Sequence, residues 1–368
     1  MKIFVCGDVI NLKSNHKICS PEMETVIKSC DYAICNFEAP IHSNGEKVKK
    51  IGPNISQLEV TPSILKQHGF DLCLLANNHM LDFGDIGLKK TIDEIRMVGM
   101  DYCGAGLSSE EAYSVKYIQQ DDITISIVNV AENHQGALDN IRKDKFGYAW
   151  INSPVLPQII IDAKSKSNFV LLMVHAGLEG YPIPQSYWRQ VYRNMCDLGA
   201  DFVIGSHPHV PQGIENYGKS KIIYSLGNFY FDKGTQNRNK ESYSIVINFK
   251  SKSDYEIEII YHSLKDGIVS RVSNPEAFNL EELSEQLENG YFLLENNMHK
   301  HIAPLLNKWY RYSNSKWLYD GGVYTTFRRL ISKLLGREIL DKKLLNIHLK
   351  MNESYQFALS SQNKENEK

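Results

Sequence analysis

Short apolar runs alternate with amphipathic stretches through residues 1–230, and polar residues follow each run directly. The runs and the residues after them are KIFVCGD (2–8), DYAICNFE (31–38), FDLCLLANNH (70–79), ITISIVNVAENH (123–134), NFVLLMVHAG (168–177), DFVIGSHPH (201–209) and KIIYSLGNF (221–229). Runs of this length, rich in β-branched residues, are typical of strands buried on both faces of a sheet.

Helical patterns fall between these runs. Thr61 and Pro62 offer an N-cap and a first-turn proline for a helix that leads to Gly69. Residues 87–99 and 186–199 each carry an apolar stripe at helical spacing and end at a glycine. Strands that alternate with helices predict a layered α/β architecture.

The pattern changes after residue 240. SYSIVINFK (242–250) and YEIEIIYHS (255–263) predict two consecutive antiparallel strands. From residue 276 the chain has a helical stripe, and residues 276–355 are predicted to form a helical extension. The polar residues 356–368 predict a disordered tail.

Composition narrows the class of protein. The net charge of -2 gives no global field for nucleic acid or an anionic membrane surface. The seven cysteines form no C-x-x-C pair and several lie in apolar runs, which predicts reduced thiols. No apolar stretch has the length of a signal-peptide core or a membrane span, so we expect a cytoplasmic protein with no integral membrane segment.

Six of the predicted strands end in residues that can bind a metal. They are Asp8, Glu38, Asn78, Glu132 with His134, His175, and His207 with His209. Because loops at the carboxyl ends of parallel strands converge, these side chains are expected to meet. The nitrogen and oxygen ligands, without thiolate, suit Zn, Mn or Fe, and the size of the set favours two ions.

Each residue also has a purely structural interpretation. Asp8 could cap a helix, Asn78 could stabilise a turn, and His175 could be a hydrogen-bonded core histidine. The pair His207 and His209 could simply form a tight loop. Taken together, the strand-end residues favour a site.

Six motifs resemble the CapA family of poly-γ-glutamate capsule biosynthesis proteins, which are built on a calcineurin-like metallophosphoesterase fold. They are GDV (7–9), NFEAP (36–40), ANNHMLDFGDIGL (76–88), VHAGLE (174–179), GADFVIGSHPHV (199–210) and YSLGNFYFD (224–232). The resemblance covers roughly residues 1 to 250. It implies a four-layer metallophosphoesterase-like α/β sandwich over residues 1–275, followed by the helical extension.

The same resemblance implies roles for individual residues. The implied metal ligands are Asp8, Glu38, Asn78, His175, His207 and His209. His79 would be the general acid, with Asp82 orienting it. Residues expected to line the substrate pocket are Glu132, His134, Glu179 and Arg189.

This chain departs from classical phosphoesterases at two positions. They carry Asp-x-His in the first motif, whereas Val9 and Ile10 follow Asp8 here. They also have Asp where this chain has Glu38. One ion would therefore lose a ligand, so the site is expected to hold one or two divalent ions.

The resulting prediction is a metal-dependent, phosphoesterase-type hydrolase associated with the synthesis of capsule, poly-γ-glutamate or extracellular polysaccharide. Water activated by the ions would attack an anionic or polymer-precursor substrate. The alternative is a non-catalytic metal-binding assembly factor of a polymer-synthesis complex. Capsule-synthesis proteins are the expected partners, nucleic acid is not, and the helical extension is compatible with a homo-oligomer.

Overall fold

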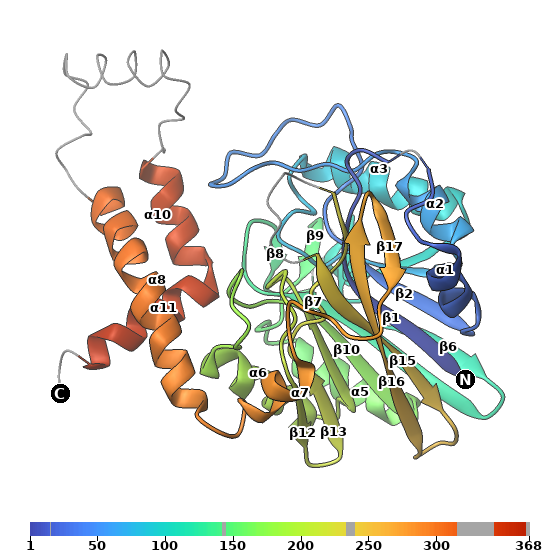
Figure 1. Cartoon of the computed structure of the whole chain (residues 1–368). Coiled ribbons are helices and arrows are strands. Elements are labelled where there is room, and N and C mark those ends of the chain that lie inside the picture. The colour runs from blue at the N-terminus through green and yellow to red at the C-terminus, as the bar shows by residue number, and fades with distance from the viewer. Residues whose placement is uncertain (15, 142–144, 233–239, 315–341, 366–368) are drawn as a thin grey trace. The chain divides into compact units, whose positions relative to one another are not determined.

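The computed structural model describes residues 1–14, 16–141, 145–232, 240–314 and 342–365 (Figure 1). The chain divides into two compact units. The main unit comprises Met1–Val48 and Asn54–Glu295, and the C-terminal unit comprises Lys49–Pro53 and Asn296–Lys368. Each unit is described by itself.

The first sheet of the main unit has the strand order β17-β16-β15-β1-β2-β3-β4, with β14 also paired to β1. Its strands are β1 (Lys2–Ile10), β2 (Tyr32–Phe37), β3 (Leu72–Leu74), β4 (Asp101–Cys103), β14 (Asn228–Phe231), β15 (Glu241–Phe249), β16 (Tyr255–Lys265) and β17 (Ile268–Arg271). Strands β1 to β4 and β14 run parallel, whereas β15 and β16 form the antiparallel pair that the sequence predicts, and β17 adds a third antiparallel strand that it does not predict.

The second sheet has the order β12-β13-β11-β10-β7-β6. Its strands are β6 (Lys116–Gln120), β7 (Ile123–Ala131), β10 (Phe169–His175), β11 (Phe202–Ser206), β12 (Ile214–Tyr217) and β13 (Ser220–Ile223). The central strands β7, β10, β11 and β13 are parallel. A small third sheet joins β5 (Ala105–Gly106), β8 (Ala137–Leu138) and β9 (Gly147–Ala149).

Helices cover the outer faces of the two large sheets. The helices of the chain are α1 (Pro21–Lys28), α2 (Thr61–Gln67), α3 (Gly84–Met97), α4 (Ser109–Ala112), α5 (Leu156–Lys166), α6 (Ser186–Asp197), α7 (Leu280–Glu285), α8 (Tyr291–Asn314), α10 (Lys342–Met351) and α11 (Glu353–Glu365). Helices α1 to α3 pack on the first sheet, and α5 and α6 pack on the second.

The core shows why four layers form. In β1, Phe4 and Cys6 belong to the apolar cluster beneath α1 to α3, whereas Ile3 and Val5 belong to the cluster between the sheets. Alternate side chains of a strand point to opposite faces, so an unbroken apolar run needs partners on both sides. A third cluster fills the space between the second sheet and α5 and α6. The expected four-layer α/β sandwich is therefore confirmed.

The main unit extends to Glu295, whereas the sequence predicts that the helical extension begins after residue 275. Leu287 and Tyr291 are buried and pack in the cluster of the second sheet, while Leu280 packs between the two sheets. These apolar side chains tie residues after 275 to the main unit.

In the C-terminal unit, helices α10 and α11 pack around a small apolar cluster built on Leu306, Leu345, Leu349 and Ala358. Helix α11 covers Glu353–Glu365, where composition predicts a disordered tail, because Tyr355, Ala358 and Leu359 supply an apolar stripe. Residues 366–368 of that predicted tail lie outside the described residues. Among the described helices, none is long and apolar enough to cross a membrane.

Candidate functional site

Asp8 reaches the site from a bulge inside β1 rather than from the end of the strand. The register with β2 shifts between Cys6 and Asp8, and the strand continues to Ile10. A Cβ at Gly7 would lie 1.8 Å from the Gly227 carbonyl oxygen, so only glycine allows this close approach. The Asp8 amide donates to the same oxygen at 3.1 Å, which fixes the buried Asp8 carboxylate.

Glu38 directly follows β2 and has no exposed surface. Neither of its carboxylate oxygens has a hydrogen-bond partner among the described residues. Oε1 lies 3.7 Å from His209 Nε2 and 3.8 Å from His175 Nε2. Burial raises the pKa of the Glu38 carboxyl to about 8, although the His209 imidazole opposes the shift. A buried carboxylate without donors is costly unless a cation compensates it.

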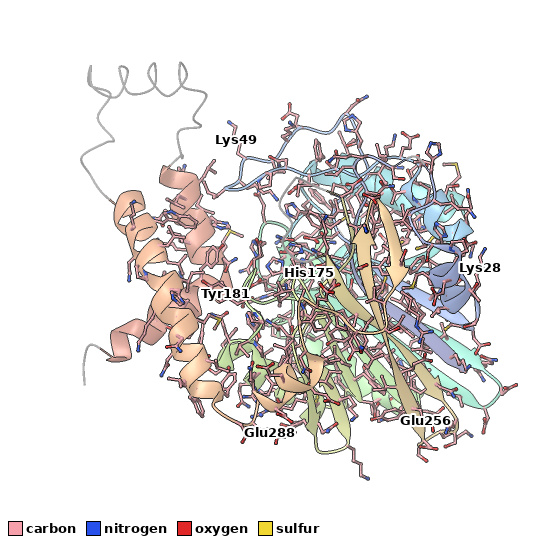
Figure 2. The ribbon with its side chains drawn as sticks, in the orientation of Figure 1. Lys28, Lys49, His175, Tyr181, Glu256 and Glu288 are labelled. Atoms are coloured by element: carbon pink, nitrogen blue, oxygen red, sulfur yellow. The ribbon has the colours of Figure 1, made fainter. Side chains whose placement is uncertain are left out.

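His175 ends β10 and is buried (Figure 2). Together with Asp8, Glu38, Asn78, His207 and His209 it makes up the strand-end cluster. Its Nε2 lies 3.0 Å from His207 Nδ1 and 3.1 Å from Asn78 Oδ1. Burial, reinforced by the neighbouring His207, lowers its pKa well below the usual range, so the ring is neutral. Ligands about 2.0–2.1 Å from one ion lie about 3 Å apart, which matches these three atoms.

His207 and His209 follow β11 on a strained loop. Their φ angles are 95° and 58°, so both residues have the left-handed backbone conformation that non-glycine residues rarely adopt. Of five non-glycine residues with positive φ in the described part of the chain, these two and Ala39 flank the cluster. Such strain costs about 1–3 kcal/mol per residue and gathers at functional sites.

His79 and Asp82 form a hydrogen-bonded pair in the turn before α3. Asp82 Oδ2 lies 2.7 Å from His79 Nδ1 and also accepts the Ile55 amide at 2.7 Å. Asp82 is buried, and His79 is 9% exposed. The carboxylate therefore holds the proton on Nδ1, which makes Nε2 the nitrogen that can exchange a proton.

The predicted substrate-pocket residues have different surroundings. Glu132 is fully buried, and its Oε1 lies 3.1 Å from His207 Nε2 and 3.7 Å from the partly exposed His134. Burial raises the pKa of the Glu132 carboxyl, but hydrogen bonds from His134 and His207 outweigh it and hold the pKa at about 2. Glu179 is exposed. Partial desolvation raises its pKa, but the imidazoles of His207 and His209 outweigh this and lower it.

Arg189 is engaged elsewhere in the main unit. Its guanidinium bonds Glu215 at 2.9 Å and lies 4.2 Å from the centre of the Tyr291 ring. Among the described residues, these contacts with Glu215 and Tyr291 lie outside the strand-end cluster. Its surroundings are those of a structural ion pair that links α6, β12 and the start of α8.

The structure also brings in two amides that sequence reasoning missed. Asn36 Nδ2 lies 2.6 Å from Asp8 Oδ1 and 3.0 Å from His175 Nδ1. Asn228 Oδ1 lies 2.9 Å from His209 Nδ1. Both belong to motifs noted in the sequence, NFEAP and SLGNF. Their position in these motifs, close in the sequence to residues that can bind a metal, is the signal that could have identified them.

Two groups in the cluster have ligand atoms within 4.8 Å of one another: Glu38 with His207 and His209, and Glu132 with His134 and His207. All offer nitrogen or oxygen, and the free cysteines lie outside both groups. Because the Glu38 oxygens face imidazoles and find no donor within the described ranges, the residues present fit a divalent cation.

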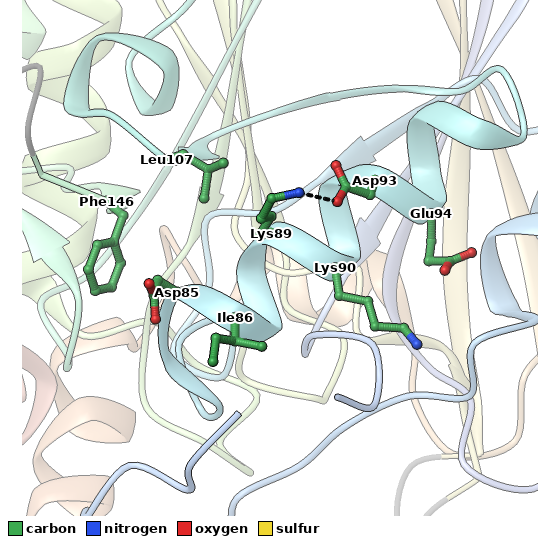
Figure 3. A pocket seen from close by; sticks show the side chains of 8 residues that line it. All are labelled: Asp85, Ile86, Lys89, Lys90, Asp93, Glu94, Leu107 and Phe146. Atoms are coloured by element: carbon green, nitrogen blue, oxygen red, sulfur yellow. Dashed lines mark hydrogen bonds and ion pairs between the residues drawn. The ribbon is translucent and has the colours of Figure 1, made fainter. Parts of the chain in front are cut away.

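A separate cavity of about 550 Å³ lies along α3 (Figure 3). Its lining residues are Asp85, Ile86, Lys89, Lys90, Asp93, Glu94, Leu107 and Phe146. Lys89 pairs with Asp93 at 2.6 Å, and none of the lining residues is a strand-end residue. This cavity carries none of the chemistry described above.

Comparisons with known proteins agree with the motifs. The family model described as "Bacterial capsule synthesis protein PGA_cap" matches residues 2–233. The capsule biosynthesis protein CapA of Bacillus anthracis is 30% identical over 249 residues, which cover 66% of this chain and 60% of that protein. The PGA biosynthesis protein CapA of Bacillus subtilis (strain 168) is 30% identical over 239 residues, 64% of this chain and 62% of that protein. The chain thus matches about 60% of the length of these relatives.

Solved structures resemble the chain only distantly. The structure of a protein described as "Putative 5'-Nucleotidase from Staphylococcus aureus" has a TM-score of 0.44 at 15% identity, and the match covers 78% of this chain and 58% of that chain. A phosphatase from Mycoplasma pneumoniae has a TM-score of 0.42 at 15% identity and covers 80% of this chain and 98% of its own. At these scores the likeness says nothing of activity.

Proposed function

Because this chain belongs to the family of bacterial capsule synthesis proteins, we propose that it is a metal-dependent, phosphoesterase-type hydrolase in the synthesis of capsule, poly-γ-glutamate or extracellular polysaccharide. One observation carries the metal dependence. Glu38 is a fully buried carboxylate with two imidazoles within 3.8 Å and, among the described residues, no hydrogen-bond donor. A divalent cation is the partner that such a group needs.

The proposed ligands are Asp8, Glu38, Asn78, His175, His207 and His209. A bound divalent ion would supply Lewis acidity and lower the pKa of a coordinated water toward neutrality. Asn36 supports this arrangement because its amide donates to Asp8 and so orients that carboxylate. The buried strand ends hold the set rigidly, which limits reorganisation during a reaction.

His79 is the proposed general acid. Asp82 keeps a proton on Nδ1 and fixes the plane of the ring, so the transferable proton resides on Nε2. Asp82 is itself held by the Ile55 amide, which keeps it from turning away. Protonation of the leaving oxygen by His79 would complete cleavage of a phosphoester in an anionic precursor.

A second candidate function is a non-catalytic, metal-binding assembly factor of a polymer-synthesis complex. One observation favours it. Val9 and Ile10, which stand where classical phosphoesterases have a histidine ligand, are fully buried among apolar side chains. One ion would then have fewer ligands, and one tightly held ion suffices for a structural role.

A turnover screen tests the proposal. Phosphoesters and γ-glutamyl amides are offered to metal-free protein with Mn²⁺ or Zn²⁺ added separately, using the wild type, His79→Gln and the exposed-site control His42→Gln. We expect metal-dependent release of phosphate that His79→Gln lowers about 10²- to 10⁴-fold, whereas His42→Gln retains it. No turnover of any substrate with either metal, in folded metal-loaded protein, would favour the assembly factor.

A further inference from the structure

His207 has one ring nitrogen committed to an acceptor. Its Nε2 lies 3.1 Å from Glu132 Oε1, and this carboxylate also accepts the Gly177 amide at 3.4 Å. An ionised carboxylate can only accept, so the proton of a neutral His207 ring resides on Nε2. Nδ1 then carries the lone pair, directed at His175 Nε2 at 3.0 Å.

His209 has the opposite arrangement. Its Nδ1 lies 2.9 Å from Asn228 Oδ1 and 3.1 Å from Asp8 Oδ2. Two oxygen acceptors on one nitrogen place the ring proton on Nδ1. The Nε2 lone pair therefore points toward Glu38, whose Oε1 lies at 3.7 Å.

From these contacts we infer that Glu132 and Asn228 are positioning residues that fix opposite tautomers of the two histidines in the H-x-H loop. Glu132 makes His207 present Nδ1, and Asn228 makes His209 present Nε2. A ligating histidine commonly donates its other N–H to such an outer partner. The tautomers follow from the hydrogen-bond contacts alone, and only their use in holding a cation rests on the proposed function.

The inference gives Glu132 a different role from the predicted one. Its carboxylate has no exposed surface, so a substrate cannot reach it without displacing His207 or His134. Asn228 begins β14, in register with Asp8 on β1, and its amide oxygen lies against the His209 imidazole. Both residues act through the histidines.

Nitrogen NMR of ¹⁵N-histidine-labelled, metal-free protein at alkaline pH reads the tautomers directly. We expect Nε2–H at His207 and Nδ1–H at His209, with Glu132→Leu, which removes the acceptor, mixing the tautomers of His207 but not those of His209. Asn228→Leu should raise the Nε2–H fraction of His209, because among the described residues it leaves only Asp8 to accept from Nδ1, and Asn228→Asp, which keeps an acceptor, should restore Nδ1–H. The control Glu215→Gln removes a buried carboxylate paired with Arg189 and Arg193, and it should change neither ring.

Zn²⁺ titrations of the same proteins give the second readout. Glu132→Leu and Asn228→Leu should weaken binding about 10- to 100-fold, and Asn228→Asp should recover most of the loss at Asn228. Nδ1–H at wild-type His207, Nε2–H at His209, or tautomers insensitive to both substitutions would overturn the inference even if Zn²⁺ binds. The expected tautomers without any Zn²⁺ binding would sustain the inference and refute the metal proposal instead.

Discussion

Replacing Glu38 with Gln isolates the cost of the buried charge. The substitution keeps the shape of the side chain and removes its ionisation. In the folded, metal-free protein the pKa of this carboxyl is about 8, against 4.5 in an ordinary environment. The folded state therefore binds more protons than the unfolded chain between these values, so wild-type stability must fall as pH rises through that window.

The expected size follows from the two pKa values. One pKa unit corresponds to about 1.4 kcal/mol, so ionisation of Glu38 lowers the free energy of unfolding by about 3–4 kcal/mol between about pH 5 and about pH 8. His209 acts in the same direction. Burial lowers its pKa, but Glu38 and Asp8 outweigh this and raise it well above the usual range. Its stabilising charge is therefore lost as pH rises through the folded pKa.

The assay is urea unfolding of chelator-treated wild type and Glu38→Gln across this pH range, repeated with saturating Zn²⁺. Without metal the wild type should lose about 3–4 kcal/mol more than the variant as pH rises, whereas Zn²⁺ should stabilise the wild type more than the variant. Glu215→Gln is a matched control, because the contribution of Glu215 to stability should depend on pH in the opposite direction. Burial raises the Glu215 pKa, but Tyr224 and Arg189 outweigh this and lower it, so its stability is lost as pH falls. Parallel pH profiles for the wild type and Glu38→Gln would refute the reasoning.

Three further predictions concern other parts of the main unit. His79→Gln and Asp82→Asn should each lower turnover about 10²-fold or more without changing metal content, measured by elemental analysis; loss of metal would make these residues ligands. Arg189→Met should lower the free energy of unfolding by about 2–3 kcal/mol and leave KM unchanged, because it breaks a buried pair with Glu215; a KM change at unaltered stability would return Arg189 to the pocket. Gly7→Ala should cost more than about 2 kcal/mol in urea unfolding, because its Cβ would overlap a backbone oxygen; an unchanged midpoint would show that β1 can shift.

Much of the fold could be predicted because apolar run length reports burial. The continuous runs of β1, β2, β7 and β10 require cover on both faces, and four layers provide it. The C-terminal part was less predictable. The apolar stripe from Leu280 to Tyr291 does not reveal which apolar surface it will contact. In the structure it packs into the apolar clusters of the main unit.

The candidate site was predictable in its members and less so in its connections. Strand ends on one edge bring Glu38, His175 and His207 together because parallel strands share a direction. The roles of Asn36 and Asn228 depend on contacts between strands distant in the sequence, which residue type alone does not show. That Arg189 lines a substrate pocket stays a prediction, because a helical arginine can face Glu215, as it does here, as easily as a substrate.

A calorimetric titration of chelator-treated protein with Mn²⁺ and Zn²⁺ most directly tests whether the strand-end cluster is a metal site. We expect one or two bound ions for the wild type and at least about tenfold weaker binding for Glu38→Gln, because the buried carboxylate faces His175 and His209 and has no hydrogen-bond partner in the part of the chain that the structure describes. A folded wild type that binds neither ion, or equal affinities for the wild type and Glu38→Gln, would contradict it.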